Sequence, residues 1–79
     1  MTHFGVYRAV VEDAADPLGL RRLRLRVPVV YGEGLSPWAE ACVAPGSRRQ
    51  PKVGDRVWVA FEEGDPTRPV WVGAMVARR

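Results

Sequence analysis

Cys42 and His3 are the single thiol and the single imidazole of the chain, and these are side chains that often act as nucleophile and base. Cys42 lies between Ala41 and Val43 in a predicted strand, where a buried and inert thiol is expected. His3 lies near the amino end, where chains tend to fray. One cysteine cannot form an intrachain disulfide, and this pair cannot supply the ligand set of a structural zinc site. We therefore expect neither catalysis nor metal binding from these residues.

Two other patterns could carry chemistry, and neither has the spacing that its chemistry needs. Glu62 and Glu63 are adjacent in a predicted turn, so their carboxylates should diverge instead of facing each other as in a glycosidase. Gly32 and Gly34 lack the full glycine pattern and the strand-to-helix setting of a phosphate-binding loop. The sequence therefore predicts a protein that is not an enzyme and that binds no cofactor.

Composition and length predict a small folded domain with many turns. The 79 residues are 47% hydrophobic and 27% charged, which is typical of a globular chain. Eight Gly and seven Pro interrupt long helices and favour short strands. The sequence shows no apolar run long enough for a membrane span and no secretory signal. We expect one domain over residues 1–79, made in the cytoplasm and not anchored in a membrane.

Five apolar runs with a period of two residues predict five strands. They are Phe4–Val11, Arg22–Val30, Trp38–Val43, Arg56–Phe61 and Val70–Ala77. Alternation is clearest in the second run, where one face is apolar and the other basic. The apolar face carries Leu23, Leu25 and Val27, and the basic face carries Arg22, Arg24 and Arg26. Pro28 cannot donate to a strand ladder, so this strand should end, bulge or lie at an edge there.

Two turns with related sequences should set the hairpins. In Asp16-Pro17-Leu18-Gly19, proline presets φ and glycine can adopt a positive φ. Gly64-Asp65-Pro66 lies between the fourth and fifth runs, which should pair antiparallel. The residues predicted to fix turn geometry are Asp16, Pro17, Gly19, Gly64, Asp65 and Pro66.

Five short strands in so small a chain should curl, because a flat sheet would leave long unpaired edges and an uncovered apolar face. An all-β, OB-type Greek-key barrel has this strand count and tolerates the long connection over residues 44–55. An SH3-like barrel is the alternative, and periodicity alone does not separate the two folds.

The fourth and fifth strands are apolar on both faces, whichever register is chosen. If Val57, Val59 and Phe61 point inward, Trp58, Trp71 and Met75 are expected to point outward. The loop over residues 44–55 could fold back over this patch within one molecule. The other explanation is a protein interface, because clustered surface tryptophans are typical of binding hot spots.

Binding of single-stranded nucleic acid is the competing function, since OB barrels can bind strands through a basic groove with stacking aromatic rings. Arg22, Arg24 and Arg26 could supply the charge, but the same strand face carries no aromatic residue. A solvated or partner-facing charged row is the preferred interpretation, and we expect nucleic acid not to be the partner.

Several segments together resemble the OB domain of phage baseplate spike proteins and of the type VI secretion spike. The resemblance rests on residues 7–11, 16–28, 36–39 and 42–43, and on the stretch 51–73 with its Gly-Asp-Pro turn between two tryptophan-bearing strands. In that family the domain is a trimeric structural element at the tail hub. The chain stops at Arg79, so piercing and cell-wall cleavage are expected to belong to other chains.

The resemblance implies a structural part of the baseplate or central spike of a contractile phage tail or phage-like injection system. We expect a homotrimer between the tail hub protein and the spike-tip protein, assembled into the particle. The residues expected to contact other subunits are Trp38, Trp58, Trp71 and Met75. Those expected to make charged contacts to the hub or a neighbour are Arg22, Arg24 and Arg26.

Overall fold

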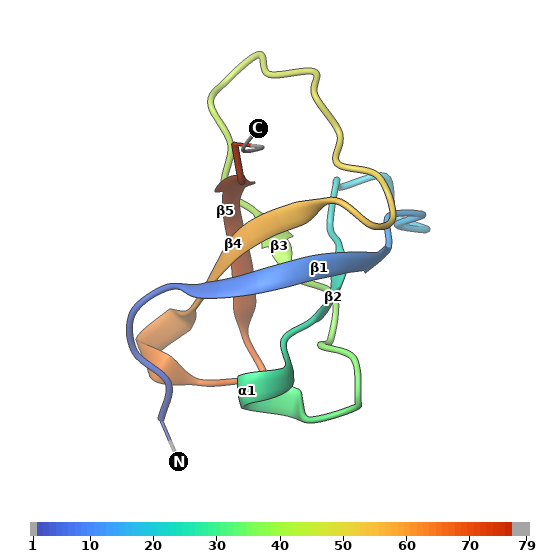
Figure 1. The fold of residues 1–79 in the computed structure, drawn as a ribbon. Coiled ribbons are helices and arrows are strands. Elements are labelled where there is room, and N and C mark those ends of the chain that lie inside the picture. The colour runs from blue at the N-terminus through green and yellow to red at the C-terminus, as the bar shows by residue number, and fades with distance from the viewer. Residues whose placement is uncertain (1, 77–79) are drawn as a thin grey trace.

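This computed structural model describes residues 2–76. In these residues, strands with alternating apolar side chains form one curled five-stranded sheet (Figure 1). The strands are β1 (Tyr7–Asp13), β2 (Arg24–Arg26), β3 (Glu40–Ala41), β4 (Arg56–Phe61) and β5 (Pro69–Ala74). Two short helical segments complete the fold, α1 (Pro28–Tyr31) and the 3₁₀ turn η1 (Glu62–Gly64). The prediction of an all-β fold is confirmed.

The sheet has the strand order β2-β1-β4-β5-β3, and it is mixed. β3 pairs parallel with β5, whereas β1 with β2, β1 with β4, and β4 with β5 are antiparallel, as expected for the last hairpin. Leu23 and Ala39 exchange backbone hydrogen bonds of 2.7 and 3.1 Å between N and O atoms. This bridge ties together the segments that lead into the two outer strands. The curled sheet is thus a half-barrel, and its strand order is the Greek-key arrangement of an OB fold.

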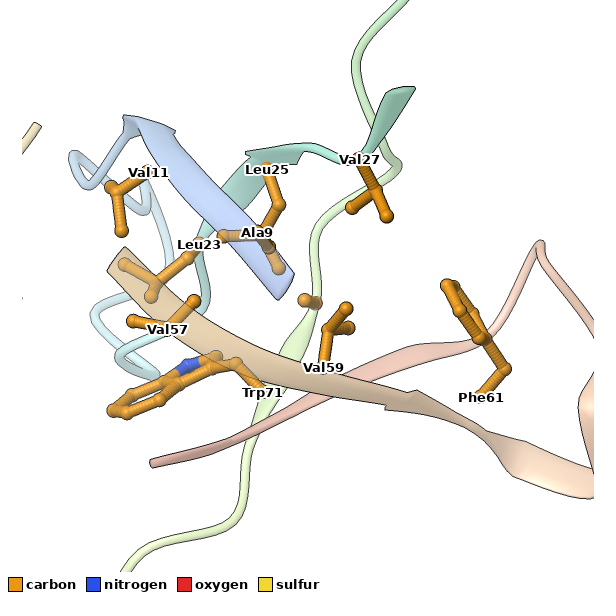
Figure 2. Packing of buried hydrophobic residues seen from close by; sticks show 10 residues of the cluster. Ala9, Val11, Leu23, Leu25, Val27, Val57, Val59, Phe61 and Trp71 are labelled. Carbon is orange, nitrogen blue, oxygen red and sulfur yellow. The ribbon is translucent and has the colours of Figure 1, made fainter. Parts of the chain in front are cut away.

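The apolar faces of β1, β2, β4 and β5 meet in one core (Figure 2). The alternation predicted for the second strand is confirmed, since its three apolar side chains are buried. From β4 the odd-numbered residues point inward. The buried apolar residues are Ala9, Val11, Leu23, Leu25, Val27, Ala39, Val57, Val59, Phe61 and Trp71.

The predicted second strand is wrong beyond Arg26. Pro28 opens α1 instead, because its fixed φ suits a first helical turn and its missing N–H is not needed there. The third strand is shorter than the predicted Trp38–Val43, and the first begins at Tyr7 instead of Phe4. The fifth strand ends at Ala74, and Ala77, its predicted last residue, lies outside the described residues.

The predicted outward orientation of Trp71 is also wrong. Trp71 is 2% exposed, and its indole Nε1 donates a 3.0 Å hydrogen bond to the carbonyl oxygen of Arg21. The cause is the register of the β4–β5 hairpin, in which Phe61 lies opposite Pro69 and Val59 lies opposite Trp71. Residues directly opposite each other share a face of the sheet, so Trp71 points inward with Val59. The bulge at Val72 shifts the alternation only beyond Trp71.

Candidate interaction surface

Trp58 lies on the outward face of β4 and is half-buried. Arg8 is its register partner on β1, and the guanidinium carbon of Arg8 is 5.4 Å from the indole ring centroid. The two side chains border a surface depression of about 920 Å³ that reaches the end of β5. We call it the Trp58 groove, and its lining residues are Arg8, Gly54, Asp55, Arg56, Trp58, Ala74, Met75 and Val76. The groove thus combines apolar surface with guanidinium groups.

Trp38, also half-buried, does not line the Trp58 groove. The Arg22 guanidinium lies over its ring, with 5.5 Å between the guanidinium carbon and the ring centroid. The structure therefore brings Trp58 and Met75 together, while Trp38 lies beside the basic row of β2.

Each guanidinium of that basic row has an acceptor within the chain. Arg22 forms a bidentate pair with the Asp16 carboxylate, through Nε at 2.9 Å and Nη2 at 2.8 Å. Arg24 Nε donates to the carbonyl oxygen of Ser36 at 3.2 Å, and Arg26 Nε donates to Glu12 at 3.0 Å. These bonds hold the row in place on one face of β2. Contact of the row with a hub or a neighbour stays a prediction.

Asp16 organises the turn that precedes β2. Besides the Arg22 side chain, its carboxylate accepts hydrogen bonds from the backbone N–H groups of Leu18, Leu20 and Arg22, at 2.9 to 3.1 Å. Gly19 adopts a φ of 65° and donates its N–H to the carbonyl of Asp16 at 3.0 Å. The Arg22 hydrogen bond and these amides hold the pKa of Asp16 well below its usual range.

The turn before β5 is built in a similar way around Asp65. Asp65 Oδ1 accepts hydrogen bonds from the backbone N–H and the hydroxyl of Thr67, at 2.9 and 2.7 Å, and these bonds lower the pKa of Asp65. Gly64 has a φ of 76°, which favours glycine. Pro66 accepts a 2.6 Å hydrogen bond from the Tyr31 hydroxyl, and burial raises the pKa of Tyr31 to about 12.

The long loop after β3 lies at one end of the barrel, away from α1 and η1 (Figure 1). Arg21 fixes it, donating to the carbonyl oxygens of Ser47, at 2.7 Å, and of Arg49. Between the loop and β5 is a pocket of about 450 Å³, lined by residues that include Pro51 and Trp71. The loop therefore folds back over the part of β5 that carries Trp71. It contributes only Gly54 and Asp55 to the lining of the Trp58 groove.

Cys42 is exposed at the side of this pocket, so the expectation of a buried thiol is wrong. β3 ends one residue earlier, at Ala41, and Cys42 therefore lies where the chain leaves the sheet. Within residues 2–76, histidine, cysteine and acidic side chains form no group of three that could hold a metal ion. No helix among these residues is long and apolar enough to cross a membrane.

The comparison with protein families agrees with the OB-type topology. A family described as the type VI secretion system/phage-baseplate injector OB domain matches residues 7–75. The chain belongs to this family. Its OB-type fold, and not the SH3-like alternative, is thereby established. No curated protein matches the chain in sequence. As an injector OB domain, the chain has a structural role in a baseplate or spike.

The sequence analysis did not predict that two arginines of this injector OB domain line the Trp58 groove. Arg8 and Arg56 lie on neighbouring strands and flank Trp58 in the groove. Their signal in the sequence is weak, since Arg8 stands alone in an apolar run. Strand pairing brings Arg8 opposite Trp58, and that register depends on contacts between residues 50 positions apart.

Proposed function

We propose that this injector OB domain is a non-enzymatic structural subunit that assembles as a homotrimer between the tail hub and the spike-tip protein. The family match over residues 7–75 supports the setting in a baseplate or spike. The observation that carries self-assembly is the Trp58 groove, which leaves a tryptophan half-buried among Arg8, Met75 and Val76. Tryptophan and arginine together are enriched at the energetic centres of protein interfaces.

Trp58 and Met75 are the subunit contacts in this proposal. Trp71 is no longer among them, because it is enclosed in the core of a single chain. Trp38 and the row Arg22, Arg24 and Arg26 form a second, charged surface, which we assign to the hub or to a neighbouring protein. The role is mechanical, since a curled sheet held together by backbone hydrogen bonds resists shear between its strands.

Light scattering on a size-exclusion column tests self-assembly. We expect the wild-type chain to elute with the mass of a trimer at micromolar concentration, and Trp58→Ala to elute as a monomer that is still folded. Leu18→Ala removes an exposed apolar side chain outside the groove and should leave the mass unchanged. A wild-type monomer, or a trimer that Trp58→Ala does not weaken, would contradict the proposal.

One observation favours the nucleic-acid alternative, namely that Trp38 lies directly beside the basic row. A stacking ring next to arginines is the arrangement used for single strands. Titration of a labelled single-stranded oligonucleotide at several salt concentrations separates the two functions. Binding of the oligonucleotide through its phosphates would weaken steeply as the salt concentration rises, because phosphate contacts release counterions. Absence of binding at low salt would remove this alternative.

A further inference from the structure

We propose that the Trp58 groove of one copy binds the acidic end of a second copy, so that neighbouring subunits meet through two different surfaces. The acidic end consists of the exposed residues Phe4, Glu62 and Glu63. The inference rests on the proposed self-assembly and names the surface that completes it.

The groove offers positive charge around an apolar floor. Among residues 2–76, the guanidinium groups of Arg8 and Arg56 and the carboxylate of Asp55 are the charged groups that line it. That carboxylate already accepts a 2.9 Å hydrogen bond from the backbone N–H of Lys52. Its apolar lining includes Trp58 and Val76, and Val76 is 90% exposed. A matching partner should therefore bring an apolar side chain together with carboxylates.

The acidic end has this composition. Phe4 is 70% exposed, and its ring lies so close to Gly64 that a Cβ there would be 3.0 Å from the ring carbons. The N–H of His3 donates a 2.8 Å hydrogen bond to the carbonyl of Gly64, which fixes the amino-terminal segment against η1. Glu62 pairs with Arg68 at 2.9 Å, and Glu63, the next residue of the turn, is exposed.

Charge complementarity selects a second copy in this orientation. If two grooves faced each other across a two-fold axis, each copy would bring Arg8 and Arg56 against one Asp55, and the excess positive charge would repel. Contact between the groove and the acidic end instead joins opposite charges. Because the two surfaces differ, the interface is heterologous, which is the kind that generates closed rings such as trimers.

Reciprocal charge reversal tests this contact. We expect Arg56→Glu and Glu63→Arg each to weaken assembly by about tenfold or more in sedimentation equilibrium, in line with measured couplings of close charge pairs. The double variant Arg56→Glu/Glu63→Arg should recover most of the affinity, because the pair is restored with its signs exchanged. Arg48→Glu makes the same charge change on the loop outside the groove and should leave assembly intact. Circular dichroism of each variant monitors folding.

The outcomes separate this inference from the proposed function. Loss of assembly in Trp58→Ala, together with two reversals whose effects simply add, would overturn the contact and leave self-assembly standing. Full assembly of either single reversal would overturn it as well. A wild-type chain that is monomeric at every concentration would overturn both proposals. Only recovery of assembly in the double variant Arg56→Glu/Glu63→Arg supports the contact.

Discussion

Trp71→Ala and Trp58→Ala should lower the free energy of unfolding by different amounts, because Trp71 lies in the core and Trp58 lies at the surface. Trp71 is 2% exposed and packs with Val57 and Leu23, so Trp71→Ala should lower the free energy of unfolding by about 3–5 kcal/mol. A domain of this length has a free energy of unfolding on the order of 4–12 kcal/mol. Trp71→Ala should therefore lose about a quarter or more of the free energy of unfolding and unfold at a clearly lower urea concentration than the wild-type chain.

Trp58 should behave differently because its indole is half-buried on the outer face. Truncation removes its contact with Arg8, which is worth about 0.5–1 kcal/mol at an exposed site, and part of its apolar burial. Trp58→Ala should therefore cost the monomer about 1–2 kcal/mol, well below the cost of Trp71→Ala.

Urea unfolding at a low protein concentration measures both changes, with far-ultraviolet circular dichroism as the signal. The low concentration keeps assembly from adding to the apparent stability. Equal losses in the two variants, or a larger loss for Trp58→Ala, would refute the assignment of Trp71 to the core and of Trp58 to the surface.

Three further substitutions test the turns and the buried polar contacts. Ser36→Ala should cost about 1–3 kcal/mol in urea unfolding, because the buried Ser36 hydroxyl accepts the Leu25 N–H at 2.9 Å and alanine leaves that N–H unpaired. The pKa of Asp16 is lowered in the folded chain, so the stabilisation from its carboxylate is present above the ordinary pKa of 3.8 and is lost as the pH falls below that value. Asp16→Asn should therefore make the free energy of unfolding depend less on pH in acid. Glu63 has a φ of 52°, and Glu63→Gly should raise monomer stability by up to about 1 kcal/mol while weakening assembly in sedimentation equilibrium.

The predicted all-β fold followed from local features of the sequence. The strict alternation of Leu23, Leu25 and Val27 with arginines fixed which face of β2 is buried, because strand side chains alternate between the two faces. Asp16-Pro17-Leu18-Gly19 and Gly64-Asp65-Pro66 placed the turns, since proline and glycine impose their own backbone angles. These signals act over a few residues and can be read without a partner strand.

The groove could not be predicted in the same way. Arg8 meets Trp58 through pairing of strands that lie far apart in the sequence, and Trp71 faces the core because the hairpin register places it opposite Val59. Pro28 likewise ends β2 in a helical turn, although the apolar run continues to Val30.

The amino-acid sequence alone determined the all-β class and the buried face of β2, because both follow from the alternation of neighbouring side chains. The tertiary structure decided which tryptophan is enclosed and which remains at the surface. That choice depends on strand register, because a shift of one residue in the pairing moves every side chain of a strand to the other face.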